Sequence, residues 1–180
     1  AKIHAKSDRY GHIRFNPISA ESLSAHLTAH YNIPVAEAEI VARMSGGSLS
    51  RAAAMTEKDW ISHRRWLIAT VSELDSHSVN YHLAFAEALA RDTERLPTAL
   101  EIMKSWYRDL AVYGHRPDHL INQDLFNTIA KLRKHYTHKR LLAIIRAIEQ
   151  TAHRIENNAN ARLAMDQLVI ALSDKELGSN

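Results

Sequence analysis

The sequence predicts an all-α protein, and its composition and patterning both support that fold class. The 180 residues include only five glycines and four prolines, which favours long elements joined by short connections. Alanine and leucine, which suit helix interiors, are frequent throughout the chain. Apolar residues recur at spacings of three and four, as one face of a helix requires. We therefore expect three short helices followed by a bundle of about five longer ones.

The first 18 residues differ from the rest because they contain the one strand-like pattern. Residues 1–10 are polar and basic without periodicity, whereas residues 12–15 (HIRF) alternate polar and apolar side chains before Pro17. A single strand cannot form a sheet, because its backbone groups need partners. We therefore expect at most one short residual strand near residues 12–15, whose partner strands lie outside this chain.

Residues 19–56 carry the signals of three short helices. Ser19 is a candidate N-cap for a helix over 20–31, and Pro34 fits the first turn of a second helix that ends at Gly46 and Gly47. Ser48 can cap a third helix that reaches residue 55. We expect these helices to form a small bundle of their own.

Residues 57–175 contain longer helices. Capping-box patterns at residues 56–59 and 98–101 predict two helix starts, and we place the domain boundary at the first. On the longest helix, Leu141, Ile145 and Ile148 form a stripe suited to packing against neighbouring helices. The helices expected here cover residues 60–74, 76–91, 98–113, 118–136, 138–157 and 161–172.

Motifs for enzymatic chemistry are absent from the sequence. It has no Gly-rich phosphate loop, G-x-S-x-G elbow, H-E-x-x-H pair or cysteine nucleophile. Asp109 and Asp124 have no evident partner at catalytic spacing, so we expect them in caps or ion pairs. We predict a chain that is not an enzyme on its own and has no cofactor or small-molecule substrate.

Two further features bear on location. No apolar run reaches the roughly 18 residues of a membrane span, and the first residues lack the apolar core of a secretory signal. Cysteine is absent, which excludes disulfides and thiolate metal sites. We expect a cytoplasmic protein without a membrane partner.

Histidines and aromatic residues offer alternatives that the sequence leaves open. His26 and His30, like His115 and His119, are spaced to share a zinc ion, but no further ligand is evident and solvated side chains are the simpler interpretation. Five aromatic residues could stack on bases, although their positions in amphipathic helices favour packing. These residues are Trp60, Trp66, Trp106, Tyr107 and Tyr113.

Positive charge is concentrated in one segment. The chain has a net charge of only +3, yet residues 131–140 (KLRKHYTHKR) carry five cations and no acid. A solvated helix end, where cations offset the helix dipole, is the simpler interpretation. The alternative is a phosphate-binding patch for DNA. Its candidate residues are Arg133, Lys134, Lys139 and Arg140.

Arg51 is the candidate ligand-binding residue of the first part. It follows the glycines and Ser48 within residues 47–52 (GSLSRA), in the first turn of a helix. A guanidinium mounted there could reach a phosphate. Pairing with an acid is the equally simple alternative.

Several segments, taken together, resemble one family. Residues 13–18 (IRFNPI) and 47–52 look like the last strand and lid of an AAA+ ATPase module. Residues 105–110 (SWYRDL), 120–124 (LINQD) and 158–168 (NANARLAMDQL) resemble the collar of the delta-prime subunits of the bacterial DNA polymerase III clamp loader.

The resemblance implies an organisation and a role. Residues 1–18 would be the remnant of the AAA+ core, 19–56 the three-helix lid and 57–175 the helical collar. Such collars join loader subunits into a pentamer that places the sliding clamp on primed DNA, so the implied partners are gamma/tau and delta, and indirectly the clamp and primer–template DNA. Arg51 matches the sensor-2 arginine. The candidate residues of the collar and subunit interface are Trp106, Arg108, Asp109, Asn160 and Arg162.

Two other interpretations stay open. A gamma/tau fragment shares the lid and collar plan, although the SWYRDL segment favours delta-prime. A free-standing helical module could instead bind DNA through residues 131–140.

Overall fold

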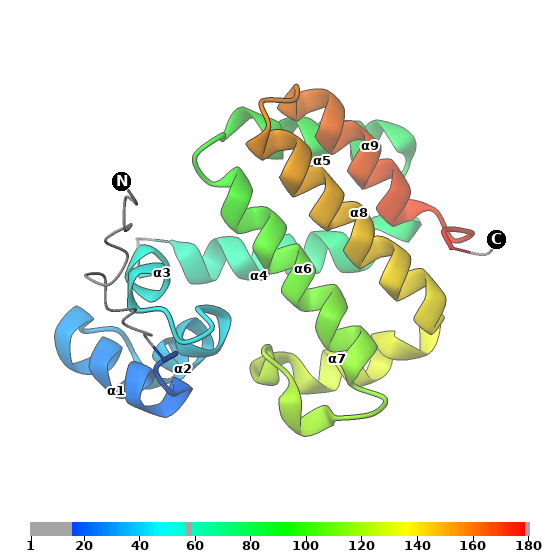
Figure 1. The fold of residues 1–180 in the computed structure, drawn as a ribbon. Helices are drawn as coiled ribbons and strands as arrows, with labels where there is room; N and C mark the ends of the chain where they lie inside the picture. The colour runs from blue at the N-terminus through cyan, green and yellow to red at the C-terminus, as the bar shows by residue number, and fades with distance from the viewer. Residues whose placement is uncertain (1–15, 57–58, 179–180) are drawn as a thin grey trace, which may run out of the picture.

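The computed structural model describes residues 16–56 and 59–178, and within these ranges every regular element is helical (Figure 1). The predicted all-α fold is confirmed. The strand expected near residues 12–15 lies outside the described residues.

The α helices are α1 (Ala20–Tyr31), α2 (Val35–Met44), α3 (Leu49–Ala54), α4 (Trp60–Glu73), α5 (Val79–Arg91), α6 (Leu96–Val112), α7 (Phe126–Leu132), α8 (His138–Glu156) and α9 (Ala161–Ser173). Single 3₁₀ turns are η1 (Leu74–Ser76), η2 (Pro117–His119), η3 (Gln123–Leu125) and η4 (Arg133–His135).

Helices α1 to α3 pack together at one end of the molecule (Figure 1). The side chain of Ser19 accepts a hydrogen bond from the first turn of α1, and Ser48 does the same for α3, as predicted. Gly47 has a φ of +82°, and a Cβ there would lie 2.6 Å from the Cβ of Pro17. Glycine at this position therefore lets the chain before α1 pass over the α2–α3 turn, where the Ile18 N–H donates to the Gly47 carbonyl.

Helix α6 is the central element of the remaining bundle. Eleven of its seventeen residues are buried, because α4, α5, α7 and α8 all contact it. Helix α9 packs against α5 and α8, which closes the bundle on the side away from α7 (Figure 1). A helix covered on so many sides needs apolar residues around most of its circumference, as the sequence of α6 provides.

Two predicted capping boxes do not form. Helix α6 begins at Leu96 rather than after Thr98, because Pro97 fits its first turn and the Asp92 carboxylate accepts the Arg95 N–H at 3.0 Å. The Thr56 hydroxyl donates to the Ala53 carbonyl at the end of α3 instead of capping α4. Helix α4 nevertheless begins at Trp60, where the sequence placed it.

The single helix predicted over residues 118–136 is wrong. The chain forms η2 and η3 before α7 starts at Phe126, and η4 follows α7. The backbone of Leu120 is extended, with φ of −68° and ψ of 140°, because the next two N–H groups donate to a side chain of α6 rather than to helix carbonyls. A long-range polar contact thus overrides the local helical pattern.

The apolar stripe of α8 is present but centred one residue away from the prediction. Leu141, Ile144 and Ile148 are buried, whereas Ile145 is only partly buried against the core. Helix α8 contacts both α6 and α9, and Leu141, Ile144 and Ile148 belong to the buried core.

Candidate functional site

A buried polar network links the two segments whose sequences, 105–110 and 120–124, resemble a collar. Asp109 of α6 is fully buried. Its Oδ2 accepts the backbone N–H of Asn122 at 2.6 Å and the Asn122 side-chain amide at 2.8 Å. Its Oδ1 accepts the Ile121 N–H at 3.1 Å and Arg108 Nη1 at 3.0 Å. This carboxylate therefore fixes the extended conformation of residues 120–122 against α6.

Arg64 of α4 completes what we call the Asp109 network, defined as Arg64, Arg108, Asp109, Asn122 and Asp124. The Arg64 side chain is fully buried and donates two hydrogen bonds to the Asp124 carboxylate, each 2.9 Å long. It also donates to Asn122 Oδ1 at 2.6 Å. The expectation that Asp109 and Asp124 take part in ion pairs is confirmed.

Sequence reasoning missed Arg64, although a signal was available. Arg64 is in helical phase with Trp60, Leu67 and Val71, all of which are buried. An arginine on the apolar face of a helix needs a buried acid as partner, because an unpaired charge there is costly. Asp124 and the Asn122 amide fill that role in the structure.

Trp106 lies in the core rather than on a surface. It is fully buried, so it supports α6 from within and does not reach another chain directly. Arg108 differs, because 41% of its side chain is exposed while Nη1 bonds Asp109 and the His119 carbonyl. Of these α6 candidates, Arg108 alone presents part of its charge to the surface.

Asn160 and Arg162 stabilise the start of α9. The Asn160 side chain accepts the Leu163 N–H at 3.0 Å, which makes it the N-cap. Arg162 pairs with Glu87 of α5 at 2.7 Å and with Asp166 at 3.0 Å. The hydrogen bond from Arg162 lowers the pKa of the Glu87 carboxyl, and the same bond raises the pKa of Arg162.

Arg51 lies at the surface and pairs with an acid. Its Nη2 is 3.4 Å from Glu101 of α6, and Glu101 also accepts from Lys104 at 2.9 Å. Half of the Arg51 side chain is exposed. This contact connects the α1–α3 region with the bundle, and it corresponds to the acid pairing left open by the sequence.

The basic segment does not form one continuous surface. Lys134 and Lys139 are exposed, and Arg133 donates to the Tyr136 carbonyl at 2.6 Å. Arg140 is buried instead, where it pairs with Asp75 of η1 at 3.1 Å. The structure therefore separates Arg140 from the surface lysines.

The remaining candidates divide between core and surface. His26 and His30 have ring centroids 4.3 Å apart, yet no group of three potential metal ligands occurs in the described parts of the chain. Trp60 and Tyr107 are buried, whereas 45% of Trp66 is exposed. Among the described helices, none is both long and apolar enough to cross a membrane.

Comparisons with known proteins indicate the family to which the chain belongs. A family model described as the C-terminal part of the DNA polymerase III delta subunit matches residues 58–174, which is more than half of the chain. No curated protein and no solved structure matches. The matched range contains the entire Asp109 network and all of helices α4 to α9. The chain therefore belongs to the family defined by the C-terminal domain of the DNA polymerase III delta subunit, which is a component of the clamp loader.

Proposed function

We propose that this chain is the C-terminal part of a DNA polymerase III delta-prime subunit and that it assembles with other clamp-loader subunits without catalysing a reaction. The family match over residues 58–174 supports the coarser part of this proposal, a clamp-loader subunit, and the resemblance of residues 105–110, 120–124 and 158–168 to delta-prime supports the finer part. In this assignment residues 1–18 end the AAA+ core, residues 19–56 form the lid and residues 57–175 form the collar. The partners are gamma/tau and delta, and through them the sliding clamp and primer–template DNA.

The Asp109 network suits a collar because it makes the surface of the bundle rigid. The buried Arg64 and Asp109, with their partners Asp124 and Asn122, fix one arrangement of α4, α6 and residues 120–124, since alternative arrangements would leave a buried charge unpaired. Rigid surfaces bind partners with a smaller entropic cost. Trp106 and Asp109 support the interface from inside, while Arg108 and Arg162 remain accessible at the surface.

Exposed apolar side chains supply candidate contact surfaces. Trp66 of α4 adjoins a cavity of about 250 Å³ that Leu89 of α5 and Leu96 of α6 also line. Asp92 and Arg95 also line this cavity, and a half-exposed tryptophan beside a hollow with both apolar and charged walls is a candidate interaction hot spot. Other large apolar side chains exposed on the bundle are Val79, Tyr81, Phe126, Leu142, Leu163 and Ile170.

Association with the other loader proteins tests the proposal. The 180-residue chain mixed with gamma/tau and delta is expected to elute with both on a sizing column. We expect Trp66→Ala to raise the dissociation constant about tenfold, because a truncated hot-spot side chain costs about 1–2 kcal/mol. Tyr31→Ala is the matched control, because Tyr31 is similarly exposed at 41% but lies on α1. Separate elution of the three proteins would refute the assignment.

The choice between delta-prime and gamma/tau needs a second observation. Gamma/tau proteins have an ATPase module with complete motifs, so the coding sequence upstream of Ala1 distinguishes the two. A complete Walker phosphate loop there would reassign the chain to gamma/tau, whereas an incomplete one supports delta-prime.

A further inference from the structure

The cavity beside Trp66 is lined by residues of three helices and of the link between two of them, and we call it the Trp66 cavity. Its volume of about 250 Å³ is below the roughly 300–1,000 Å³ of small-molecule sites, so it suits one side chain better than a ligand. Its apolar lining comes from Trp66 of α4, Ala88 and Leu89 of α5, and Leu96 and Ala99 of α6.

Two charged side chains of the Trp66 cavity neutralise each other. Asp92 and Arg95 lie in the link between α5 and α6, where each side chain is about half exposed. The Asp92 carboxylate accepts the Arg95 N–H at 3.0 Å and lies 3.8 Å from Arg95 Nε. Among the described residues that line the cavity, His63 is the only other titratable group. The net charge of the cavity therefore depends on the protonation of His63.

His63 lies beside Trp66 on α4. The two ring centroids are 5.5 Å apart, and Trp66 also meets the Phe85 ring of α5 edge-on at 5.7 Å. The Nε2 atom of His63 is buried and has no hydrogen-bond partner among the described residues. Protonation of this imidazole therefore places a cation in the wall of the cavity without an acceptor for the buried Nε2–H, which is unfavourable.

The surroundings of His63 favour its neutral form. Burial lowers the pKa of His63 below the ordinary value of 6.5, and the charge of Arg95 lowers it further, whereas the Asp92 carboxylate opposes this in part. A partner side chain that fills the cavity removes more water from the imidazole, which lowers its pKa again. Because the bound chain then holds fewer protons than the free chain, acid weakens the association.

We propose that the Trp66 cavity binds one uncharged, apolar side chain of another loader subunit, and that this docking requires His63 to be neutral. The inference rests on the proposed function for the identity of the partner and on the cavity for its chemistry. An apolar side chain complements the cavity, since the pairing of Asp92 with Arg95 leaves no net charge while His63 is neutral. A cationic side chain would instead face Arg95 and, in acid, the His63 imidazolium.

The test measures the dissociation constant between the 180-residue chain and the gamma/tau and delta subunits at two pH values and constant ionic strength, with circular dichroism to verify folding at both. We expect the constant to be at least about fivefold higher at about pH 5 than at about pH 7.5, which the binding of one proton by His63 can supply. A constant that is equal at the two pH values, or lower in acid, would overturn the inference.

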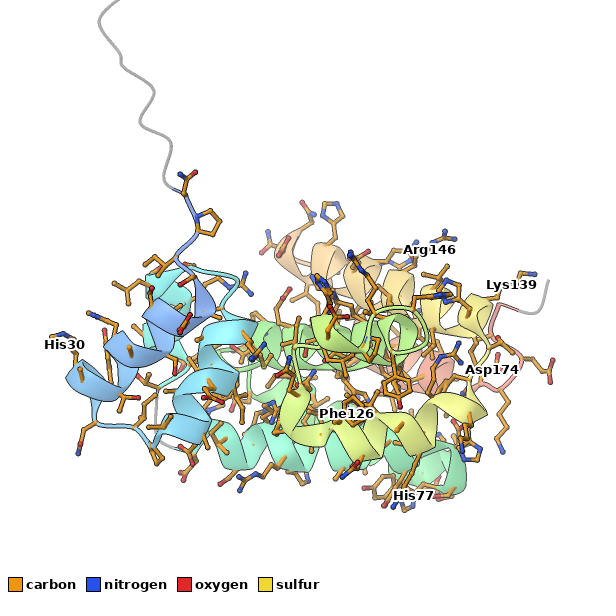
Figure 2. All side chains as sticks on the ribbon, turned by 90° about the horizontal axis from the view of Figure 1, so that it is seen from below. His30, His77, Phe126, Lys139, Arg146 and Asp174 are labelled. Atoms are coloured by element: carbon orange, nitrogen blue, oxygen red, sulfur yellow. The ribbon has the colours of Figure 1, made fainter. Side chains whose placement is uncertain are left out.

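A variant that cannot titrate assigns the pH dependence to His63. In His63→Gln the ratio of the two dissociation constants should be at least about threefold smaller than in the unchanged chain. His30→Gln and His77→Gln are the controls, because both histidines are exposed and neither lines the cavity. His30 projects from α1 at one end of the molecule and His77 from the bundle (Figure 2). A control that reduces the ratio as much as His63→Gln would overturn the inference.

Titration of the free chain separates this inference from the proposed function. Proton NMR of the imidazole, assigned by its absence from His63→Gln, should give a pKa below 6.5 for His63. A pKa at or above 6.5 would overturn the inference without affecting the assignment to the clamp loader. Absence of association at every pH would refute the proposed function and this inference together, whereas association that is insensitive to pH would refute the inference alone.

Discussion

The α1–α3 region and the α4–α9 bundle are both helical, but different interactions determine their structures. In α1–α3 the helix ends are set by neighbouring residues: Ser19 and Ser48 cap, Asn32 ends α1 at a φ of +53°, and Gly47 provides the turn before α3. In the bundle, the path of the chain after α6 depends on Asp109 and Arg64, which contact residues far away in sequence. Local signals therefore set the helix ends of the first region, whereas in the second region a long-range polar contact sets the path of the chain between α6 and α7.

The largest effect should come from a charge placed in the centre of the bundle. Ile144 is fully buried between α8 and its neighbours. We expect Ile144→Asp to lower the free energy of unfolding by more than about 4 kcal/mol, because an unpaired carboxylate would replace buried apolar surface. Urea denaturation followed by circular dichroism measures the loss.

Ile145→Asp is the matched variant for this prediction, because it makes the same change on a side chain that is only partly buried. It should cost less than about half as much, since its carboxylate can reach water. Equal losses of stability in the two variants would mean that Ile145 contributes to the core as much as Ile144 does, as the sequence pattern predicted.

Removing Arg64 should have the next largest effect. Arg64→Met keeps the volume in the core but leaves Asp124 and Asn122 without their donors, which should cost about 3 kcal/mol. Arg65→Met, at the exposed neighbouring position, should change stability by less than about 0.5 kcal/mol. Amide exchange at Ile121 should also accelerate in Arg64→Met alone. A stable Arg64→Met protein would show that the bundle does not depend on the network.

The two regions explain how much of the structure could be predicted from the sequence. Helix starts at Ala20, Leu49 and Ala161 follow local rules in both regions, because the side chains of Ser19, Ser48 and Asn160 cap them. The helix predicted over 118–136 failed, because Asp109 accepts the N–H groups of residues 121 and 122 from a helix that ended earlier in the chain. Periodicity within a segment holds no information about such a contact.

The candidate functional residues follow the same division. Asn160 occupies a helix start, so its capping role depends on neighbouring residues, whereas the partner of Arg51, Glu101, lies fifty residues away in the sequence. Trp106 and Asp109 were expected at an interface, yet both are buried because α6 is covered by four other helices. A resemblance in sequence marks a residue as characteristic of the family, but burial decides whether it acts at the surface or beneath it.

The smallest expected effect concerns the contact that joins the two regions. Arg51 and Glu101 are 3.4 Å apart with side chains 50% and 43% exposed, and Lys104 competes for the same carboxylate. A double-mutant cycle of Arg51→Ala and Glu101→Ala should therefore give a coupling below about 0.5 kcal/mol at about 0.1 M salt and none at about 1 M. A coupling above about 1 kcal/mol that resists salt would mean that this pair holds the regions in a fixed orientation. A weak coupling would instead mean that apolar packing sets this orientation, because Leu23 and Leu27 of α1, Trp60 of α4 and the residues of the bundle belong to one buried core.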